Sequence, residues 1–227
     1  YTLRTLFPYT TLFRSYITGG AVIKTCEKLK EQMIEESARL LECPIENVEF
    51  CGQKIFSLKD NKSMTLVELG NASLLGRSKM LTACESHYSM VSPPPFMVGI
   101  VEIEIDKLTG KVDIIDFASV VDCGTVINPN LARIQTEGGI AQGIGMALYE
   151  EISYDEKGRM RNDSFMQYKI PTRLDVGNIR VEFESSYEPT GPFGAKSIGE
   201  IVINTPSPSL ANEIGRASCR ERVFAGC

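Results

Sequence analysis

The chain has only one histidine, His87, and no two cysteines are separated by just two residues. A Ser-His or Cys-His nucleophilic centre, or a site with several histidine ligands, would have to be built around that residue. We interpret His87 as a surface or core residue in a loop. Iron–sulfur clusters are held by closely spaced cysteines, so the sequence predicts neither a cluster nor a metal-ligand set on this chain.

Long apolar stretches and clusters of basic residues are also missing. No apolar run reaches the length of about eighteen residues that a transmembrane helix needs, and no signal peptide precedes the first helix. The net charge is −5 and the basic residues are scattered, which argues against nucleic-acid binding. The odd number of cysteines, seven, indicates reduced thiols. We expect a cytoplasmic globular protein.

Both ends of the chain look foreign to the rest. Residues 1–15, YTLRTLFPYTTLFRS, are rich in Thr, Leu and Phe without any period, and they resemble a translated sequencing adapter. Residues 215–227 begin with an abrupt basic string, GRASCRERV, of the same character. We therefore predict one domain over residues 16–214, between two non-native segments.

The first part of this domain predicts a long helix followed by short elements. Apolar residues recur at helical spacing from Gly19, and Pro44 ends the helix. The apolar runs 48–50 and 54–56 predict a hairpin. A short helix is predicted over 65–75, and three consecutive prolines after it predict a stiff linker.

Strand patterns dominate after the prolines. Alternating apolar residues at 98–105 and 112–120 flank a turn that ends with Gly110, which predicts a hairpin. Asn128 and Pro129 then predict a helix start, with Asn as the N-cap and Pro at the first helical position.

The remaining elements complete the fold prediction. The helix that starts at Asn128 is expected to end at about Glu151, followed by a hairpin around 152–167 and a strand at 179–185. A last helix is expected to begin at Ser207. Strands mixed with separate helices, without regular βαβ alternation, predict an α+β fold with mixed sheets and packed helices.

One predicted helix carries an unusual number of glycines, in RIQTEGGIAQGIGMALYEE. Each glycine costs about 1 kcal/mol relative to alanine inside a helix, so a close approach of another backbone or of a ligand must compensate. Gln135 and Gln142 lie seven residues apart on roughly one face and could present amides to a polar ligand. Tight helix packing with two solvated glutamines is the alternative.

A second locus is the glycine-spaced segment GPFGAKSIGE, residues 191–200. Backbone N–H groups of such a loop can point at an anion or a cofactor. Glu200 precedes an apolar stretch, and burial among apolar groups makes a carboxylate a better proton acceptor near neutral pH. It could equally be an acidic residue near a helix start. The segment before the glycine-rich helix contains Cys123, which we interpret as part of a structural turn.

Three segments in this order resemble the molybdenum hydroxylases, the xanthine dehydrogenase and aldehyde oxidase family. They are DCGTVINPNLARIQTEGGIAQGIGMALYEE, DSFMQYKIPT and FGAKSIGE, and the YITGGAVIKTCEKLKEQM helix matches as well. The resemblance covers about residues 16–214 and comes nearest to bacterial xanthine dehydrogenase. It implies the C-terminal portion of the molybdopterin-binding domain of the large catalytic subunit.

The resemblance also implies a chemistry. Glu200 falls on the family's general base, which helps water-derived oxygen attack an electron-poor carbon of a purine such as xanthine or hypoxanthine. Gln135 matches the family's Q-x-E-G pattern, and the following cofactor-binding residues are implied: Gln135, Gly138, Gly139, Gln142, Ser197, Ile198 and Gly199. The cofactor is molybdenum-molybdopterin, with a dinucleotide form left open. Iron–sulfur and FAD domains or subunits take the electrons.

The resemblance is incomplete upstream. Further cofactor and substrate contacts of the family come from segments before residue 16, so we expect this chain alone neither to bind molybdopterin stably nor to turn over. Two alternatives stay open. The enzyme could be an aldehyde or nicotinate hydroxylase, or the chain could be an inactive scaffold that lends its glycine-rich helix to a partner.

Overall fold

The computed structural model describes residues 16–217, so the predicted foreign segment 1–15 and most of the predicted tail lie outside the described residues. The described chain forms two compact units. One contains Ile17–Ser89, and the other contains Tyr16 together with residues 90–217. The boundary falls just before the three prolines that predict a linker. Across the described residues, no helix is long and apolar enough to cross a membrane.

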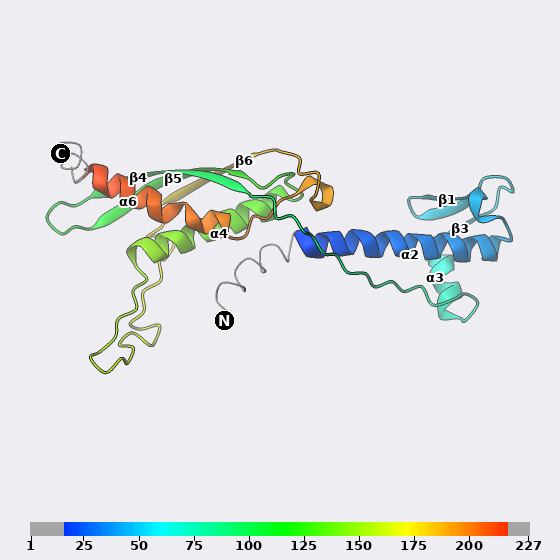
Figure 1. Cartoon of the computed structure of the whole chain (residues 1–227), viewed down its shortest axis with the longest axis horizontal. Helices are drawn as coiled ribbons and strands as arrows, with labels where there is room; N and C mark the ends of the chain where they lie inside the picture. Colours follow the sequence, from blue (N-terminus) through cyan, green and yellow to red (C-terminus); the bar gives the residue numbers. More distant parts are fainter. Residues whose placement is uncertain (1–15, 218–227) are drawn as a thin grey trace. The chain divides into compact units, whose positions relative to one another are not determined.

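The Ile17–Ser89 unit is built on one long helix, α2 (Thr18–Leu41), coloured blue in Figure 1. Three short antiparallel strands form its sheet in the order β1 (Val48–Cys51), β2 (Lys54–Ser57) and β3 (Ser63–Thr65). The predicted helix and hairpin are confirmed, while the sequence missed β3 because three residues carry too little pattern. Helix α3 (Leu66–Leu74) begins with a capping box between Thr65 and Glu68.

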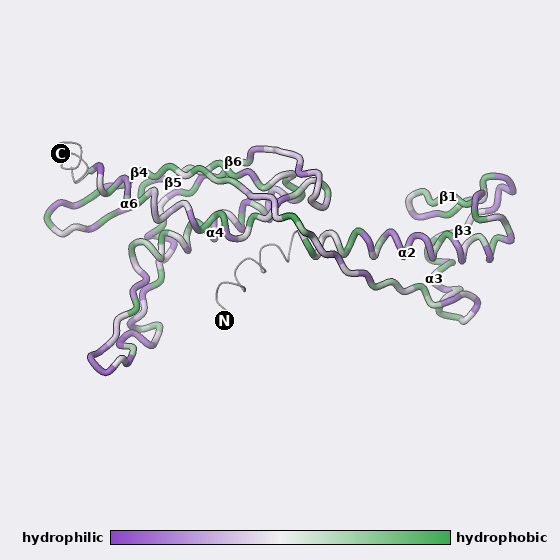
Figure 2. Tube along the Cα trace, viewed as in Figure 1, coloured by the Kyte–Doolittle hydropathy of each residue, from purple (hydrophilic) through white to green (hydrophobic). Residues whose placement is uncertain are grey.

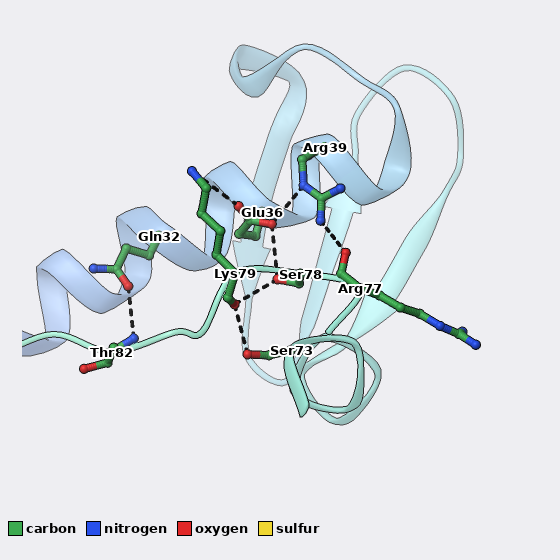
Figure 3. A network of polar contacts seen from close by, with 8 residues as sticks. All are labelled: Gln32, Glu36, Arg39, Ser73, Arg77, Ser78, Lys79 and Thr82. Carbon is green, nitrogen blue, oxygen red and sulfur yellow. Dashed lines mark hydrogen bonds and ion pairs between the residues drawn. The ribbon is translucent and has the colours of Figure 1, made fainter. Parts of the chain in front are cut away.

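A polar network ties the chain after α3 to helix α2 (Figure 3). The carboxylate of Glu36 accepts hydrogen bonds from Arg39 Nε at 2.9 Å and from Ser78 Oγ at 3.1 Å. Lys79 Nζ lies 3.9 Å from its other oxygen. Arg39 also donates to the Arg77 carbonyl at 2.6 Å. The buried carboxylate is therefore fully engaged, which is the condition under which a charge is tolerated inside a protein.

The other unit is a three-stranded sheet in the order β4 (Phe96–Ile105), β5 (Val112–Asp122) and β6 (Asn178–Glu184). Strands β4 and β5 are the predicted hairpin. Strand β6 pairs with β5 in parallel, which requires the crossover through α4 (Pro129–Leu148). The resulting α+β fold is the predicted class, although the parallel pairing was not foreseen from the sequence.

Two helices cover one face of this sheet. Helix α4 and helix α6 (Pro206–Ala217) pack against each other and against the strands, and the short helix α5 (Ile201–Asn204) precedes α6 (Figure 1). Apolar residues predominate along β4 and β5, whereas α2 mixes hydrophilic and hydrophobic residues (Figure 2). The core between sheet and helices is formed by Val101, Ile114, Phe117, Ile140, Ile144, Val176, Val181 and Leu210.

Three boundaries differ from the prediction. Helix α4 ends at Leu148 rather than Glu151, and α6 runs from Pro206 to Ala217, beyond the predicted start of the tail at Gly215. The predicted hairpin around 152–167 is shorter than expected: Tyr154 and Met160 form an antiparallel bridge, flanked by backbone hydrogen bonds from Asp155 N–H to the Arg159 carbonyl and from Arg161 N–H to the Ser153 carbonyl. Its turn is held locally, because the Asp155 carboxylate accepts backbone N–H groups two and four residues on.

Candidate functional site

A pocket of about 390 Å³ lies between the chain after β5, the first turns of α4 and the glycine-spaced segment that follows β6. Gln135 and Glu200 both line it. The implied cofactor-binding residue and the implied general base therefore line one pocket. Ile198 and Gly199 line the same pocket. Its volume falls in the range of small-molecule sites.

The first turns of helix α4 line the pocket, and an N-cap fixes where the helix begins. The Asn128 side chain accepts the Leu131 N–H at 3.1 Å, and Pro129 occupies the first turn, as predicted. Leu131, Ala132 and Gln135 follow at helical spacing and all line the pocket. The cap thus sets which face of α4 presents the Gln135 amide.

The glycine-spaced segment is held against the end of β5 by backbone contacts. Gly124 and Ala195 form an antiparallel bridge, and Lys196 N–H donates to the Cys123 carbonyl at 2.7 Å. Gly124 has a φ of 71°, and a Cβ there would lie 2.4 Å from the Gly194 carbonyl oxygen. Only glycine fits this close approach, which brings residues 195–200 next to the start of α4.

An ion pair closes the same junction. Lys196 Nζ lies 2.7 Å from Asp122 Oδ2, and it also lies 5.5 Å from the centre of the Phe96 ring. Asp122 Oδ1 accepts from Ser186 Oγ at 2.6 Å and from Gly124 N–H at 2.9 Å. Burial pushes the Asp122 pKa upward, but the hydrogen bonds from Lys196, Ser186 and Gly124 outweigh it and hold the pKa below its usual value.

The topology explains why these groups meet. Phe96 and Asp122 are register partners at the start of β4 and the end of β5. Strand β6 runs parallel to β5, so Ser186 leaves the sheet at the same edge. Ligands of α/β sheets commonly bind outside the carboxyl ends of the strands. The pocket lies at this edge.

Two buried polar atoms at the segment 197–200, Ser197 Oγ and Glu200 Oε1, have no hydrogen-bond partner within the part of the chain that the structure describes. Leaving a buried polar group unpaired costs about 1–3 kcal/mol, so such atoms in a folded protein call for an explanation in terms of function or of a missing ligand. Unpaired donors and acceptors beside a pocket with an amide and exposed backbone fit a polar, hydrogen-bonding cofactor.

The other predicted binding residues do not line this pocket. Gly138 has open space around it, and Gln142 is exposed. Gly139 is buried where a Cβ would lie 2.2 Å from Val202 Cγ2, and Gly143 lies against the Ile203 carbonyl of the same short helix. The alternative of tight helix packing is therefore confirmed for Gly139 and Gly143. Cofactor binding by Gly138, Gly139, Gln142 and Ser197 stays a prediction.

Sequence reasoning missed the residues that fix the pocket wall, Asp122 and Lys196. The local signals were an acidic residue at a strand end and a lysine inside a glycine-spaced loop, and the two lie 74 positions apart in the sequence. Within residues 16–217, no three His, Cys, Asp or Glu side chains cluster so as to hold a metal ion.

Comparisons with known proteins agree with this geometry. A family model described as "Molybdopterin cofactor-binding domain" matches residues 13–177, a range that ends before Glu200. The putative xanthine dehydrogenase molybdenum-binding subunit of Escherichia coli K12 is 30% identical over 210 residues, 90% of this chain and 28% of that protein. Subunit gamma of the 6-hydroxypseudooxynicotine dehydrogenase complex of Paenarthrobacter nicotinovorans is 31% identical over 208 residues, 88% of this chain and 26% of that protein.

A solved structure extends the agreement to the fold. Quinoline 2-oxidoreductase from Pseudomonas putida 86 matches with a TM-score of 0.69 and 27% identity, over 89% of this chain and 27% of that one. The fold is thus that of a piece of a molybdopterin-binding domain. This chain belongs to the molybdenum hydroxylase family, as the ordered motifs predicted. It spans about a quarter of the length of the relatives it matches.

Proposed function

We propose that this chain forms the C-terminal part of a molybdenum hydroxylase active site, in which Glu200 is the general base. The single observation that carries the proposal concerns Glu200, which lines the pocket and whose buried carboxylate oxygen Oε1 has no hydrogen-bond partner among residues 16–217. A carboxylate with a free acceptor oxygen can take a proton from a water-derived nucleophile. Molybdenum held by molybdopterin supplies the electron-accepting chemistry when it is bound.

The remaining pocket residues support binding rather than chemistry. The Gln135 amide offers both donors and an acceptor, and it suits the polar edge of a pterin. Ile198 and Gly199 lie in the pocket wall, where backbone N–H groups can donate to an anionic or carbonyl oxygen. Ser197 Oγ is buried and unpaired, so a bound polar group would satisfy it.

For the substrate we propose a purine such as xanthine or hypoxanthine, supported by the similarity to the xanthine dehydrogenase subunit. An N-heterocycle of the nicotinate type is the second candidate, because the 6-hydroxypseudooxynicotine and quinoline enzymes are equally similar. An aldehyde is the third. Iron–sulfur and FAD domains or subunits are the proposed electron acceptors. Location in the cytoplasm stays a prediction.

The decisive test is Glu200→Gln in the complete enzyme, because glutamine keeps the shape and removes the base. We expect turnover to fall by about 10²–10⁴-fold, the usual contribution of a general base. Molybdenum content by elemental analysis should stay unchanged. Glu156→Gln, the same change at an exposed site outside the pocket, is the control. Retained turnover in Glu200→Gln would remove Glu200 from the mechanism. Xanthine, nicotinate and an aldehyde compared with one artificial acceptor would decide the substrate class.

A further inference from the structure

Two groups of opposite charge line the pocket but are not paired with each other. Lys196 and Glu200 both contribute to its wall. The Lys196 ammonium is engaged by Asp122 Oδ2 at 2.7 Å and lies over the Phe96 ring, whereas Glu200 Oε1 has no partner. An ammonium and a carboxylate that line one pocket can form a charge-assisted hydrogen bond, yet Lys196 pairs with Asp122 instead.

Asp122 is well suited to hold the lysine. The side chains of Lys196 and Asp122 are only 11% and 19% exposed, so water cannot easily replace either partner. Two further donors, Ser186 Oγ and Gly124 N–H, fix Asp122 Oδ1 and leave Oδ2 for the lysine. The carboxylate is therefore oriented before it meets Lys196.

Two other titratable groups near Lys196 have their own surroundings. Glu188 is close enough to interact with its charge, but the Glu188 carboxylate already accepts the N–H and the hydroxyl of Thr190. The Cys123 thiol also lines the pocket; burial, and then the charge of Asp122, raise its pKa, so it stays neutral. Among the described pocket residues, Glu200 is the carboxylate left for a lysine released from Asp122.

We propose that Asp122 is a positioning residue that holds Lys196 at the sheet edge and thereby keeps its charge from pairing with Glu200. The inference rests on the proposed function of Glu200 as a base. It gives the ion pair a role beyond stability, since a carboxylate paired with a lysine would be a poorer proton acceptor. It also explains why the loop that carries Glu200 places a lysine four residues before it.

The test uses the complete enzyme and compares Asp122→Asn with the double variant Asp122→Asn/Lys196→Met. Asparagine keeps the shape and most hydrogen bonds but releases the lysine. We expect kcat of Asp122→Asn to fall at least about tenfold, part of what a general base contributes, with little change in KM. Molybdenum content should be unchanged. The double variant should recover activity, because no lysine remains to pair with Glu200.

The effect of adding Lys196→Met to Asp122→Asn on kcat decides whether the ion pair has a positioning role or only a structural one. A merely structural ion pair predicts that the double variant is no more active than Asp122→Asn, and that result would overturn the inference, as would wild-type kcat in Asp122→Asn. If Asp122→Asn fails to assemble, Ser186→Ala loosens Asp122 without changing a charge. It should lower kcat with full molybdenum content, and added Lys196→Met should restore it; an unchanged kcat overturns the inference.

Glu200→Gln in the same preparation separates the two proposals. Retained turnover in Glu200→Gln refutes the proposed function itself. Lost turnover there, together with no recovery in the double variant, refutes only the role of Asp122. Asp113→Asn serves as the matched control, because it makes the same change in an exposed ion pair with Lys111 that lies outside the pocket. We expect its kcat to equal that of the wild type.

Discussion

Glu36 and Glu200 are two carboxylates with buried oxygens in one chain, and the protein treats them in opposite ways. Glu36, in the Ile17–Ser89 unit, accepts from Arg39 and Ser78 and lies near Lys79 (Figure 3). Glu200, in the other unit, has one oxygen that no protein group engages, although a lysine lines the same pocket. The first arrangement stabilises a fold, and the second keeps a carboxylate available.

The means of support differ as well. Polar side chains hold Glu36, so its position depends on hydrogen bonds. Glu200 is placed by backbone packing: it directly precedes α5, and Val202 of that helix is buried against Gly139 of α4. A group that must exchange partners during a reaction cannot be held by its own hydrogen bonds, so the surrounding packing has to fix it.

The largest effect expected from this difference is that of Gly139→Ala. Its Cβ would lie 2.2 Å from Val202 Cγ2 and 3.0 Å from Val202 Cβ, so α5 has to shift. Overpacking of this kind costs about 1–3 kcal/mol. In the complete enzyme, a displaced Glu200 should also lower turnover by about tenfold or more, because catalytic geometry tolerates little displacement. Thermal unfolding and steady-state kinetics measure the two losses.

Gly138→Ala is the matched control one residue earlier. Nothing lies within 4 Å of a Cβ at this position. Alanine should therefore stabilise α4 by up to about 1 kcal/mol, without displacing α5. An equal loss of stability in Gly138→Ala and Gly139→Ala would show that α4 needs glycine at both positions. Glu200 would then not be positioned through Gly139.

A smaller effect is expected from Glu36→Gln. The change removes a charged acceptor from Arg39 and Ser78, and it should lower the free energy of unfolding by about 1–2 kcal/mol, the usual contribution of such hydrogen bonds. Turnover of the complete enzyme should not change. Glu200→Gln should do the reverse, with lost turnover and undiminished stability. A loss of stability in Glu200→Gln larger than that in Glu36→Gln would break the comparison.

The elements that the sequence predicted well are those with local causes. The start of α4 is defined by Asn128 and Pro129, whose chemistry acts within one turn, and the β4–β5 hairpin follows from strict alternation and the turn at Gly110. The predicted hairpin at 152–167 has a local cause too, and it is present only near its turn. The Asp155 carboxylate holds the turn, and the two arms pair between Ser153 and Arg161 but not beyond.

The pocket wall depends on contacts that no local pattern encodes. Asp122 and Lys196 meet because β6 returns parallel to β5 and brings the following loop to the same sheet edge. Neither residue has a neighbour in sequence that requires the other. The motif resemblance located Gln135 and Glu200 without this knowledge, but only the folded chain shows that they line one pocket and which oxygen is left unpaired.

The smallest expected effect is the acid response of the Glu36 network. Burial pushes the Glu36 pKa upward, but the hydrogen bonds from Arg39 and Ser78 prevail and hold the pKa below its usual value. A carboxylate whose pKa is lower in the folded state contributes stability above its unfolded pKa, about 4.3, and loses it as the pH falls through the folded pKa. Stability should thus decrease below about pH 4.3.

Glu36→Gln isolates this contribution, because it cannot titrate. The difference in stability between the wild type and Glu36→Gln should be constant near neutral pH and should shrink below about pH 4.3, since the protonated carboxyl resembles the amide. The loss of stability in acid cannot exceed the loss that Glu36→Gln causes at neutral pH, so it is the smallest of the expected effects. Urea unfolding of both chains at pH 7 and pH 3.5 measures it. A stability difference between the wild type and Glu36→Gln that stays the same in acid would mean that Glu36 acts through its shape rather than its charge. The contrast with Glu200 would then no longer be one of paired against unpaired carboxylates.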